Sequence, residues 1–409
     1  MVIQWKIMRH TAKKISILKD KFLYTAIIIL VYLFGRCIPL YGIKKLQYTE
    51  RSMDVGNMLI QTVSGDADRC SLFALGISPY MIAMILVQFA VAFRKACDSG
   101  GRISPKKINR ISLVLTVFFA SVQALLRMQE LPFCVTEELF PSAKAVSFLE
   151  MVTGAVLILW LADRNRKYGF GGQTILIYIN ILDGITAKLG SYSIKVLTVP
   201  LLTAVAVIWI ILLMENTEKR IPVQRISIHN IYADKNYLAV KFNTVGAMPV
   251  MFSTAFFMLP QMLVTLLAWL FPKNNRIAWW QDNLILTRPL GIGVYILILY
   301  LLTIGFAVVM ISPGEITQQF LKSGDSIPNI HAGRDTRRYL TREICRISFF
   351  SATVMSICLG VPMYLQLRGE ADTMLSMFPA SAMILTSIWC SLYQEFLAVK
   401  SFDAYDPFV

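Results

Sequence analysis

Residues 71–82 read Ser71-Leu72-Phe73-Ala74-Leu75-Gly76-Ile77-Ser78-Pro79-Tyr80-Met81-Ile82, and the apolar run that they open continues to Phe93. The run is long enough to cross a bilayer, yet it contains Gly76, Pro79 and Gln88. A proline inside a spanning helix removes a backbone hydrogen bond, which in lipid must be replaced by neighbouring helices or by a water-filled cavity. The stretch therefore fits either the wall of a pathway through a membrane or an ordinary kinked helix.

The segment before this run, residues 41–69, is neither a clean span nor a plain hydrophilic loop. Its middle, Val55–Gly65, is mildly apolar and only two or three turns long. Crossing a bilayer as a helix takes roughly 20 residues. The segment is therefore either a half-inserted piece that feeds an irregular helix, as in many membrane pathways, or an extracellular loop.

The composition excludes an ordinary soluble globule. Of 409 residues, 56% are hydrophobic and 16% are charged, and the mean hydropathy is +0.58. These values indicate a polytopic membrane protein. The net charge of +15 is spread over separate segments without interleaved aromatic residues, which argues against nucleic-acid binding. The seven cysteines form no C-x-x-C pair and have no histidine at metal-ligand spacing, so we expect neither a metal site nor a disulfide framework.

The hydropathy pattern predicts ten membrane spans, of which the fifth is the weakest because Asn180, Asp183 and Lys188 interrupt it. Ionisable residues within spans usually face the bundle interior or a water-filled cavity. The predicted spans are Phe22–Leu40, Cys70–Phe93, Arg110–Leu126, Val146–Ala162, Gly172–Leu189, Val196–Met214, Ala247–Phe271, Pro289–Ile311, Ile347–Leu367 and Leu375–Tyr393.

The positive charge of the connecting segments predicts the orientation. With the amino end placed in the cytoplasm, the inside segments hold 27 Lys and Arg residues and the outside segments hold 10. This bias follows the positive-inside rule, so both termini are expected to be cytoplasmic. Arg36 and Pro39 occupy the place where a signal peptide would need a small-residue cleavage site, so the first apolar run is expected to be a retained helix.

Two long loops expected in the cytoplasm, 215–245 and 313–346, have sequence patterns typical of secondary structure. Alternating apolar residues at 226–229 and 237–243 indicate a hairpin, and residues 314–321 indicate a short helix. Arg337, Arg338 and Arg342 follow at near-helical spacing before the ninth span. The loops either dock a cytosolic partner, which their length favours, or only connect helices.

The expected fold is an all-α polytopic membrane protein of ten transmembrane helices in two inverted five-helix halves. An odd number of spans per half gives the halves opposite topology, as in inverted-repeat transporters. The expected division is a cytoplasmic segment at 1–21, a first half at 22–190 that includes residues 41–69, a second half at 191–394, and a tail at 395–409.

Signatures of catalysis are missing from the sequence. We find no P-loop, G-x-G-x-x-G, H-E-x-x-H or G-x-S-x-G motif. His10, His229 and His331 have no obvious carboxylate or serine partner, and Asp163 and Asp183 lie too far apart in sequence to suggest an acid–base pair. No enzymatic activity, cofactor or metal is expected.

Several stretches together resemble the SecY family of protein-translocation channels. The most specific is F-A-L-G-I-S-P-Y at 73–80, and the others follow in order along nearly the whole chain. They are Trp160-Leu161 with Gly169-Phe170-Gly171, Lys241-Phe242-Asn243 with Gly246 and Pro249, Pro313–Ile316 through Lys322–Gly324, and Ile327-Pro328 to Arg334.

The resemblance implies a clamshell of two halves around a pore that opens across the membrane and sideways into lipid. A ring of bulky side chains would seal the pore around a passing chain without binding any particular sequence. By this resemblance the plug would contain Val55, Met58, Leu59, Ile60, Thr62 and Val63; the pore ring would be Ile77, Met81, Thr174, Tyr178, Met251 and Leu385; and polar positions of the lateral gate would be Gln88, Gln123 and Asn243.

The resemblance also implies partners: a SecA-type motor ATPase, a SecE-like small membrane subunit and unfolded preprotein substrates. Motor docking would fall on Lys219, Arg220, Arg225, His331, Arg334, Arg337, Arg338 and Arg342. The sequence departs from the family at Thr174 and Tyr178, where the ring is usually isoleucine, and at His331, where arginine is usual. With a short hairpin and a brief tail, these departures suggest an accessory SecY of Gram-positive plasma membranes. Such a protein would work with an accessory SecA and accessory secretion proteins to export glycosylated serine-rich adhesins.

Two other functions remain open from the sequence. A ten-span secondary transporter of a small solute would need a polar site near the midplane, for which Asp183 is the obvious anchor. A scaffold or insertase without a through-pore would share the same apolar spans.

Overall fold

The structure is a computed structural model. It describes residues 2–43, 71–96, 104–128, 131, 133, 140–189, 194–225, 236–246, 248–271, 274–286, 288–367 and 373–402. The predicted plug residues, 55 to 63, lie outside this range. The described chain forms two compact units, made of residues 1–191, 258–281 and 388–409 in unit 1, and 192–257 and 282–387 in unit 2.

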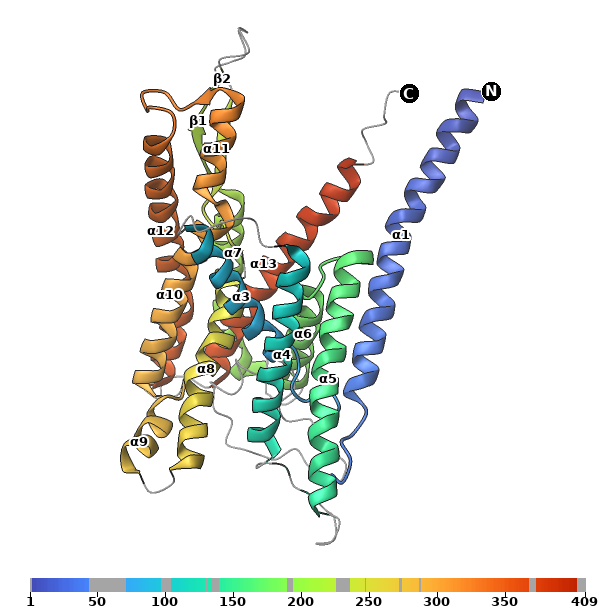
Figure 1. Ribbon diagram of the computed structural model, residues 1–409, viewed down its shortest axis with the longest axis vertical. Helices are drawn as coiled ribbons and strands as arrows, with labels where there is room; N and C mark the ends of the chain where they lie inside the picture. Colours follow the sequence, from blue (N-terminus) through green and yellow to red (C-terminus); the bar gives the residue numbers. More distant parts are fainter. Residues whose placement is uncertain are drawn as a thin grey trace. The chain divides into compact units, whose positions relative to one another are not determined.

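Apolar runs of the sequence fold into helices, and every one of the ten predicted spans falls on one of them (Figure 1). The helices are α1 (Val2–Arg36), α3 (Ser78–Ala96), α4 (Pro105–Met128), α5 (Phe140–Tyr168), α6 (Thr174–Leu189), α7 (Ile194–Asn216), α8 (Met248–Leu270), α9 (Asn275–Asn283), α10 (Pro289–Ile311), α11 (Pro313–Ser323), α12 (Arg334–Leu367) and α13 (Thr373–Phe402). The short strands are β1 (Glu218–Pro222), β2 (Gln224–Arg225), β3 (Tyr237–Lys241) and β4 (Asp325–Ser326).

Six helical segments of the described chain each contain a stretch that is long enough and apolar enough to cross a membrane, which makes this a multi-pass membrane protein. They are Lys106–Met128, Phe140–Tyr168, Met248–Leu270, Pro289–Ser323, Arg334–Leu367 and Phe378–Lys400. Three shorter apolar helices cover Ser78–Val91, Thr174–Thr186 and Pro200–Asn216. The count of ten spans therefore stays a prediction.

Unit 1 is built around small side chains that let its helices approach closely. Ala120 and Ala124 of α4 and Ala155 of α5 are buried in one cluster with Leu75 and Met151. Gly154 of α5 lies against the backbone of Leu72, where an added Cβ would come within 2.0 Å of the carbonyl oxygen. Small residues at such contacts are typical of helix packing in membranes, where close van der Waals contact replaces the hydrophobic effect as the source of association.

Unit 2 contains a break between α10 and α11, where one helix ends and the next begins in a new direction. Pro313 begins α11 and Ser312 adopts a left-handed conformation with φ 48°. A proline has no N–H to continue the preceding helix, so a sharp stop at Ser312 follows from the sequence. The predicted short helix at 314–321 is thereby confirmed as α11.

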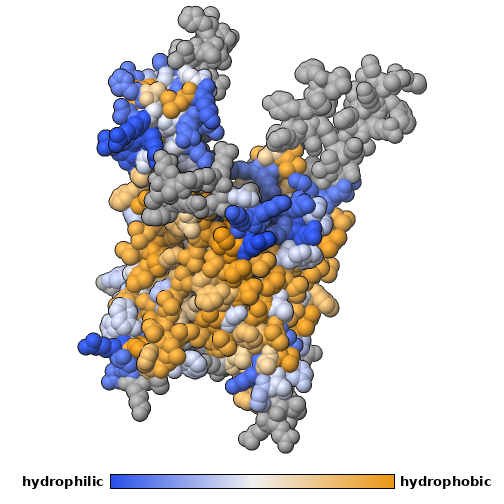
Figure 2. Space-filling model, in the orientation of Figure 1, coloured by the Kyte–Doolittle hydropathy of each residue, from blue (hydrophilic) through white to orange (hydrophobic). Residues whose placement is uncertain are grey.

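Polar structure gathers at one end of unit 2. β1, β2, α11 and the start of α12 lie there together (Figure 1), and hydrophilic side chains cover that end while the lengths of the helices of this unit are hydrophobic (Figure 2). β1 and β3 pair antiparallel with Lys219 opposite Val240. The second arm of the predicted hairpin is thus confirmed as β3, but its partner is residues 218–222; residues 226–229 lie outside the described range.

Candidate functional site

The four predicted ring residues of unit 1 lie in the first turns of two helices or just before them. Ile77 and Met81 are each 1% exposed at the start of α3, and the Met81 N–H donates to the Ile77 carbonyl over 3.0 Å, so the two lie one turn apart. Thr174 and Tyr178, also one turn apart, are partly buried at the start of α6. Gly171 and Gly172 precede α6 with φ values of +67° and +46°, which only glycine adopts readily, so the entry angle of α6 is set by this pair.

The two predicted ring residues of unit 2 differ in burial. Met251, in the first turn of α8, is buried, and Leu385 in the middle of α13 is partly buried. Five of the six ring positions therefore lie within the first two turns of a helix or just before it. The convergence of all six side chains on one constriction stays a prediction.

Two of the three predicted gate residues, Gln123 and Asn243, make hydrogen bonds within their own units. The Ser78 hydroxyl donates to Gln123 Oε1 over 3.0 Å, which joins α3 to α4 in unit 1. In unit 2, Asn243 Nδ2 donates to Glu215 Oε1 over 2.9 Å. Gln88 is partly buried on α3. Glu215 was missed by the sequence reasoning, although a lone carboxylate at the end of the apolar helix α7 is a signal that it needs a partner.

The two predicted docking loops fold together into one subdomain. β2 of the first loop pairs antiparallel with β4 of the second, with Arg225 opposite Asp325. Beneath the strands lies one apolar cluster drawn from both loops and the start of the ninth span. Its buried members are Ile221, Val240, Ile327, Leu340 and Ile347. A shared core makes the two loops a single surface, because neither loop can bury its apolar residues without the other.

An ion-pair cluster ties the hairpin to α12. Lys219 of β1 pairs with Glu343 of α12, and Arg346 Nη1 donates to the other Glu343 oxygen over 2.8 Å. Glu343 is 4% exposed. The hydrogen bond from Lys219 and the two nearby positive charges hold the pKa of the Glu343 carboxyl below its ordinary value. Of the predicted docking residues, Lys219 therefore has an internal structural role.

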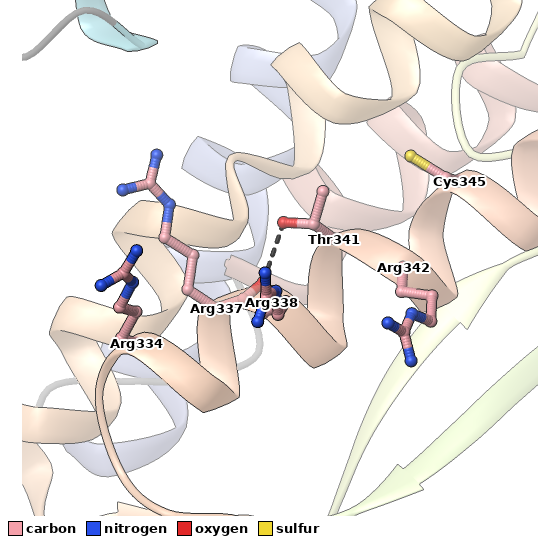
Figure 3. A pocket seen from close by; sticks show the side chains of 6 residues that line it. All are labelled: Arg334, Arg337, Arg338, Thr341, Arg342 and Cys345. Carbon is pink, nitrogen blue, oxygen red and sulfur yellow. Dashed lines mark hydrogen bonds between the residues drawn. The ribbon is translucent and has the colours of Figure 1, made fainter.

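Exposed arginines on the first turns of α12 form a basic face. Arg334, Arg337, Arg338 and Arg342 are exposed and line an open pocket of about 480 Å³ with Thr341 and Cys345. In Figure 3 the guanidinium groups of Arg334 and Arg337 extend on the same side of the helix. Guanidinium groups bind carboxylates through paired N–H donors, so this face suits an acidic partner surface.

The remaining predicted docking residues flank this face or the hairpin. His331 is exposed just before α12. Arg220 donates to Glu218 over 2.9 Å and lies 4.6 Å from the centre of the Tyr237 ring. Arg225 lies in β2.

A buried polar network in unit 1 was not foreseen from the sequence. Arg36, at the end of α1, pairs with Asp183 of α6 at 2.7 Å, and the Tyr32 hydroxyl donates to Asn180 Oδ1 at 2.7 Å. The sequence presented Asp183 as isolated and as a possible solute anchor; the structure gives it a cationic partner that is far away in the chain.

Comparison with known proteins agrees with this architecture. The described fold is that of protein-conducting channels: it matches "The structure of a protein conducting channel" with a TM-score of 0.67, 17% identity and coverage of 94% of this chain and 93% of that one. It also matches Sec61 of the canine ribosome-channel complex with a TM-score of 0.59, 16% identity and coverage of 94% and 93%. The sequence model of the SecY family matches residues 71–393, and the chain belongs to the SecY family.

Relatives of similar length carry a more specific name. An accessory Sec system protein translocase subunit SecY2 of Leuconostoc gelidum is 28% identical over 96% of this chain and 97% of its own length. A SecY2 of Streptococcus agalactiae is 28% identical over 94% of each chain.

Proposed function

We propose that this chain is the channel subunit of an accessory Sec-type protein translocase, which conducts unfolded preproteins across the plasma membrane. The observation that carries the proposal is the match to accessory SecY2 relatives over nearly the full length of both chains, together with the SecY family match. The glycosylated serine-rich adhesins expected from the sequence are the proposed cargo. Both termini are proposed to be cytoplasmic, because the positive-inside bias places the basic subdomain of unit 2 on that side.

In this proposal the chain is a passive conduit and a separate motor supplies the energy. The pore ring would be Ile77, Met81, Thr174, Tyr178, Met251 and Leu385, with Val55 to Val63 as the plug. Apolar side chains that meet around a narrow pore block ions by excluding water, and they part around an extended polypeptide without reading its sequence. Thr174 and Tyr178 add hydroxyls to this ring, so we expect a wetter seal than an all-isoleucine ring gives.

The lateral gate would use the polar groups of Gln88, Gln123 and Asn243. Hydrogen bonds such as Ser78–Gln123 are worth roughly 0.6 kcal/mol in a membrane, with a range up to about 2 kcal/mol. Bonds of this strength hold a closed state and still yield to an inserting signal helix.

The motor is proposed to be an accessory SecA that docks on the cytoplasmic subdomain. The basic face of α12 supplies the charge, and the shared core keeps its geometry fixed. A SecE-like subunit would brace the helices, and accessory secretion proteins would join the complex. The rival function of a solute transporter is disfavoured because Asp183, its proposed anchor, is paired with Arg36.

The decisive experiment traps a secretory chain in transit. A preprotein with a folded, unthreadable carboxy-terminal domain is expressed with channel variants that carry a single cysteine at Ile77, Tyr178 or Met251, on a background without the seven native cysteines. We expect crosslinks from the stalled chain to all three positions. A matched control is Leu301→Cys on α10, a side chain 64% exposed. Crosslinks at the control that equal those at 77, 178 and 251 would refute a central pore.

A further inference from the structure

A buried network of Tyr32, Arg36, Asn180 and Asp183 joins α1 to α6 in unit 1. Arg36 donates from Nη2 to Asp183 Oδ2 over 2.7 Å and from Nη1 to Asn180 Oδ1 over 3.4 Å. Tyr32 donates from its hydroxyl to the same Asn180 oxygen. The side chain of Arg36 is 3% exposed, whereas that of Asp183 is 35% exposed.

The position of this network within predicted membrane spans gives it a high free-energy cost. Both Arg36 and Asp183 fall within predicted membrane spans, where ionisable side chains are expensive and usually serve a function. Simple helix attachment does not require charge, because buried ion pairs are often replaced by apolar residues without loss of stability. The network is therefore expected to provide something that apolar packing does not, namely one fixed orientation of the helices that it joins.

The helix geometry shows which orientation is fixed. Tyr178 and Asn180 are two residues apart on α6, which places them roughly 200° apart around the helix axis. Asp183 shares the side of Asn180, and Thr174 shares the side of Tyr178. Arg36 and Tyr32 therefore hold the face of α6 opposite to the two proposed ring residues.

The same end of α1 also fixes the turn that leads into α3. The Tyr32 ring stacks on Phe73 with centroids 5.7 Å apart. Gly35 leaves room for Phe73, since a Cβ at Gly35 would come within 2.1 Å of that ring. The Leu72 N–H donates to the Ile38 carbonyl over 2.9 Å, and Ile77 follows within the turn. The end of α1 thus contacts both segments of unit 1 that carry proposed ring residues, namely α6 and the turn before α3, and fixes their positions.

We infer that Arg36, Asp183, Asn180 and Tyr32 are positioning residues for the pore seal, which hold α6 and the turn before α3 at the rotation that keeps the resting channel closed to ions. This inference rests on the proposed function. It adds that the tightness of the seal depends on a charge pair behind the ring, on the side away from the ring residues.

The test measures ion leak through purified, reconstituted full-length protein without a motor. Arg36→Gln and Asp183→Asn each break the pair, and we expect each to raise the leak at least about tenfold over the wild type. Tyr32→Phe keeps the ring and its stacking and removes one hydrogen bond, so we expect a smaller rise. The exchanged pair Arg36→Asp with Asp183→Arg should return the leak toward the wild-type value.

A matched control is available on α5. Arg166 and Asp163 also form an Arg–Asp pair, at 2.6 Å, but both side chains are about half exposed. Asp163→Asn should leave the leak unchanged. An equal rise in this control, or no rise in Arg36→Gln and Asp183→Asn, would overturn the inference. Where the Arg36 variants fail to reach the membrane, Tyr32→Phe decides, because an unchanged leak in that variant also counts against it.

The outcome separates this inference from the proposed function. If the stalled preprotein crosslinks to the wild-type pore while the leak of the variants is unchanged, only the positioning role is wrong. If the wild type gives no specific crosslinks, the proposed function itself is wrong.

Discussion

The shared core of the subdomain that the two loops form allows a quantitative prediction. Leu340 of α12 has no exposed surface and packs with Ile221 and Val240 of the hairpin. A buried Leu→Ala change loses the transfer free energy of the removed methyl groups and leaves a cavity, at a cost of about 2–5 kcal/mol. Taking about 3 kcal/mol for Leu340→Ala, the opened form of the subdomain becomes on the order of 100 times more populated.

Amide hydrogen exchange in detergent or nanodiscs measures that opening directly. The amides of β1 and β3 lie about 100 residues before Leu340 in the sequence, so a local effect on α12 does not reach them. If the two loops share one core, exchange at Ile221 and Val240 should accelerate by about the same 100-fold factor as at the start of α12.

Leu321→Ala on α11 is the matched control, because Leu321 is 56% exposed and the chemical change is identical. Surface substitutions usually change stability by less than about 0.5 kcal/mol, so exchange at β1 and β3 should stay near the wild-type rate. Equal hairpin exchange in Leu340→Ala and Leu321→Ala would refute the shared core and, with it, the single docking surface.

Three further predictions follow from the site. Replacement of Arg334, Arg337 and Arg338 by Glu should abolish preprotein export and motor binding while the protein still inserts into the membrane. As a control, charge reversal at the exposed basic residues Lys106, Lys107 and Arg110 should not abolish motor binding. Unchanged export in the α12 variant would count against docking on α12. Met81→Gly combined with Met251→Gly should widen the seal and raise ion conductance in planar bilayers, and a tight trace would contradict the ring assignment. The pKa of Glu343 is lower in the folded protein than in the unfolded chain, where it is about 4.3. The ion pair of Glu343 with Lys219 therefore stabilises the subdomain fully at pH values above the unfolded pKa, and this stabilisation is lost as the pH falls through the folded pKa. Exchange protection at Val240, corrected for intrinsic rates, should therefore fall in acid for the wild type and less for Glu343→Gln.

The sequence alone was informative where function depends on local pattern. Apolar runs predicted helices at all ten proposed spans, including the fifth, which polar residues interrupt, since helices satisfy every backbone hydrogen bond within one segment. The short helix predicted at 314–321 is α11, which begins at Pro313 because proline cannot continue the preceding helix. The F-A-L-G-I-S-P-Y stretch at 73–80 led to the family that the comparisons then established.

Local pattern was insufficient where a short element or a distant partner was involved. The alternation at 237–243 indicated a strand, but alternation does not show which other segment that strand pairs with. In the structure β3 pairs with residues 218–222. Six of the described helical segments contain a stretch with the length and hydropathy of a full span, and the count of ten stays a prediction. The plug residues lie outside the described range, and their role stays a prediction.

Tertiary structure alone decided how the charges are paired. Arg36 meets Asp183 across 147 positions of the chain, and Lys219 meets Glu343 across 124. Sequence spacing shows which side chains share one helix face, but it does not show which faces meet once the helices pack. The amino-acid sequence determined that these charges lie in or beside apolar helices. The fold determined that each of the two carboxylates faces a cation, because leaving the buried Arg36 or the buried Glu343 without its partner costs about 3–5 kcal/mol.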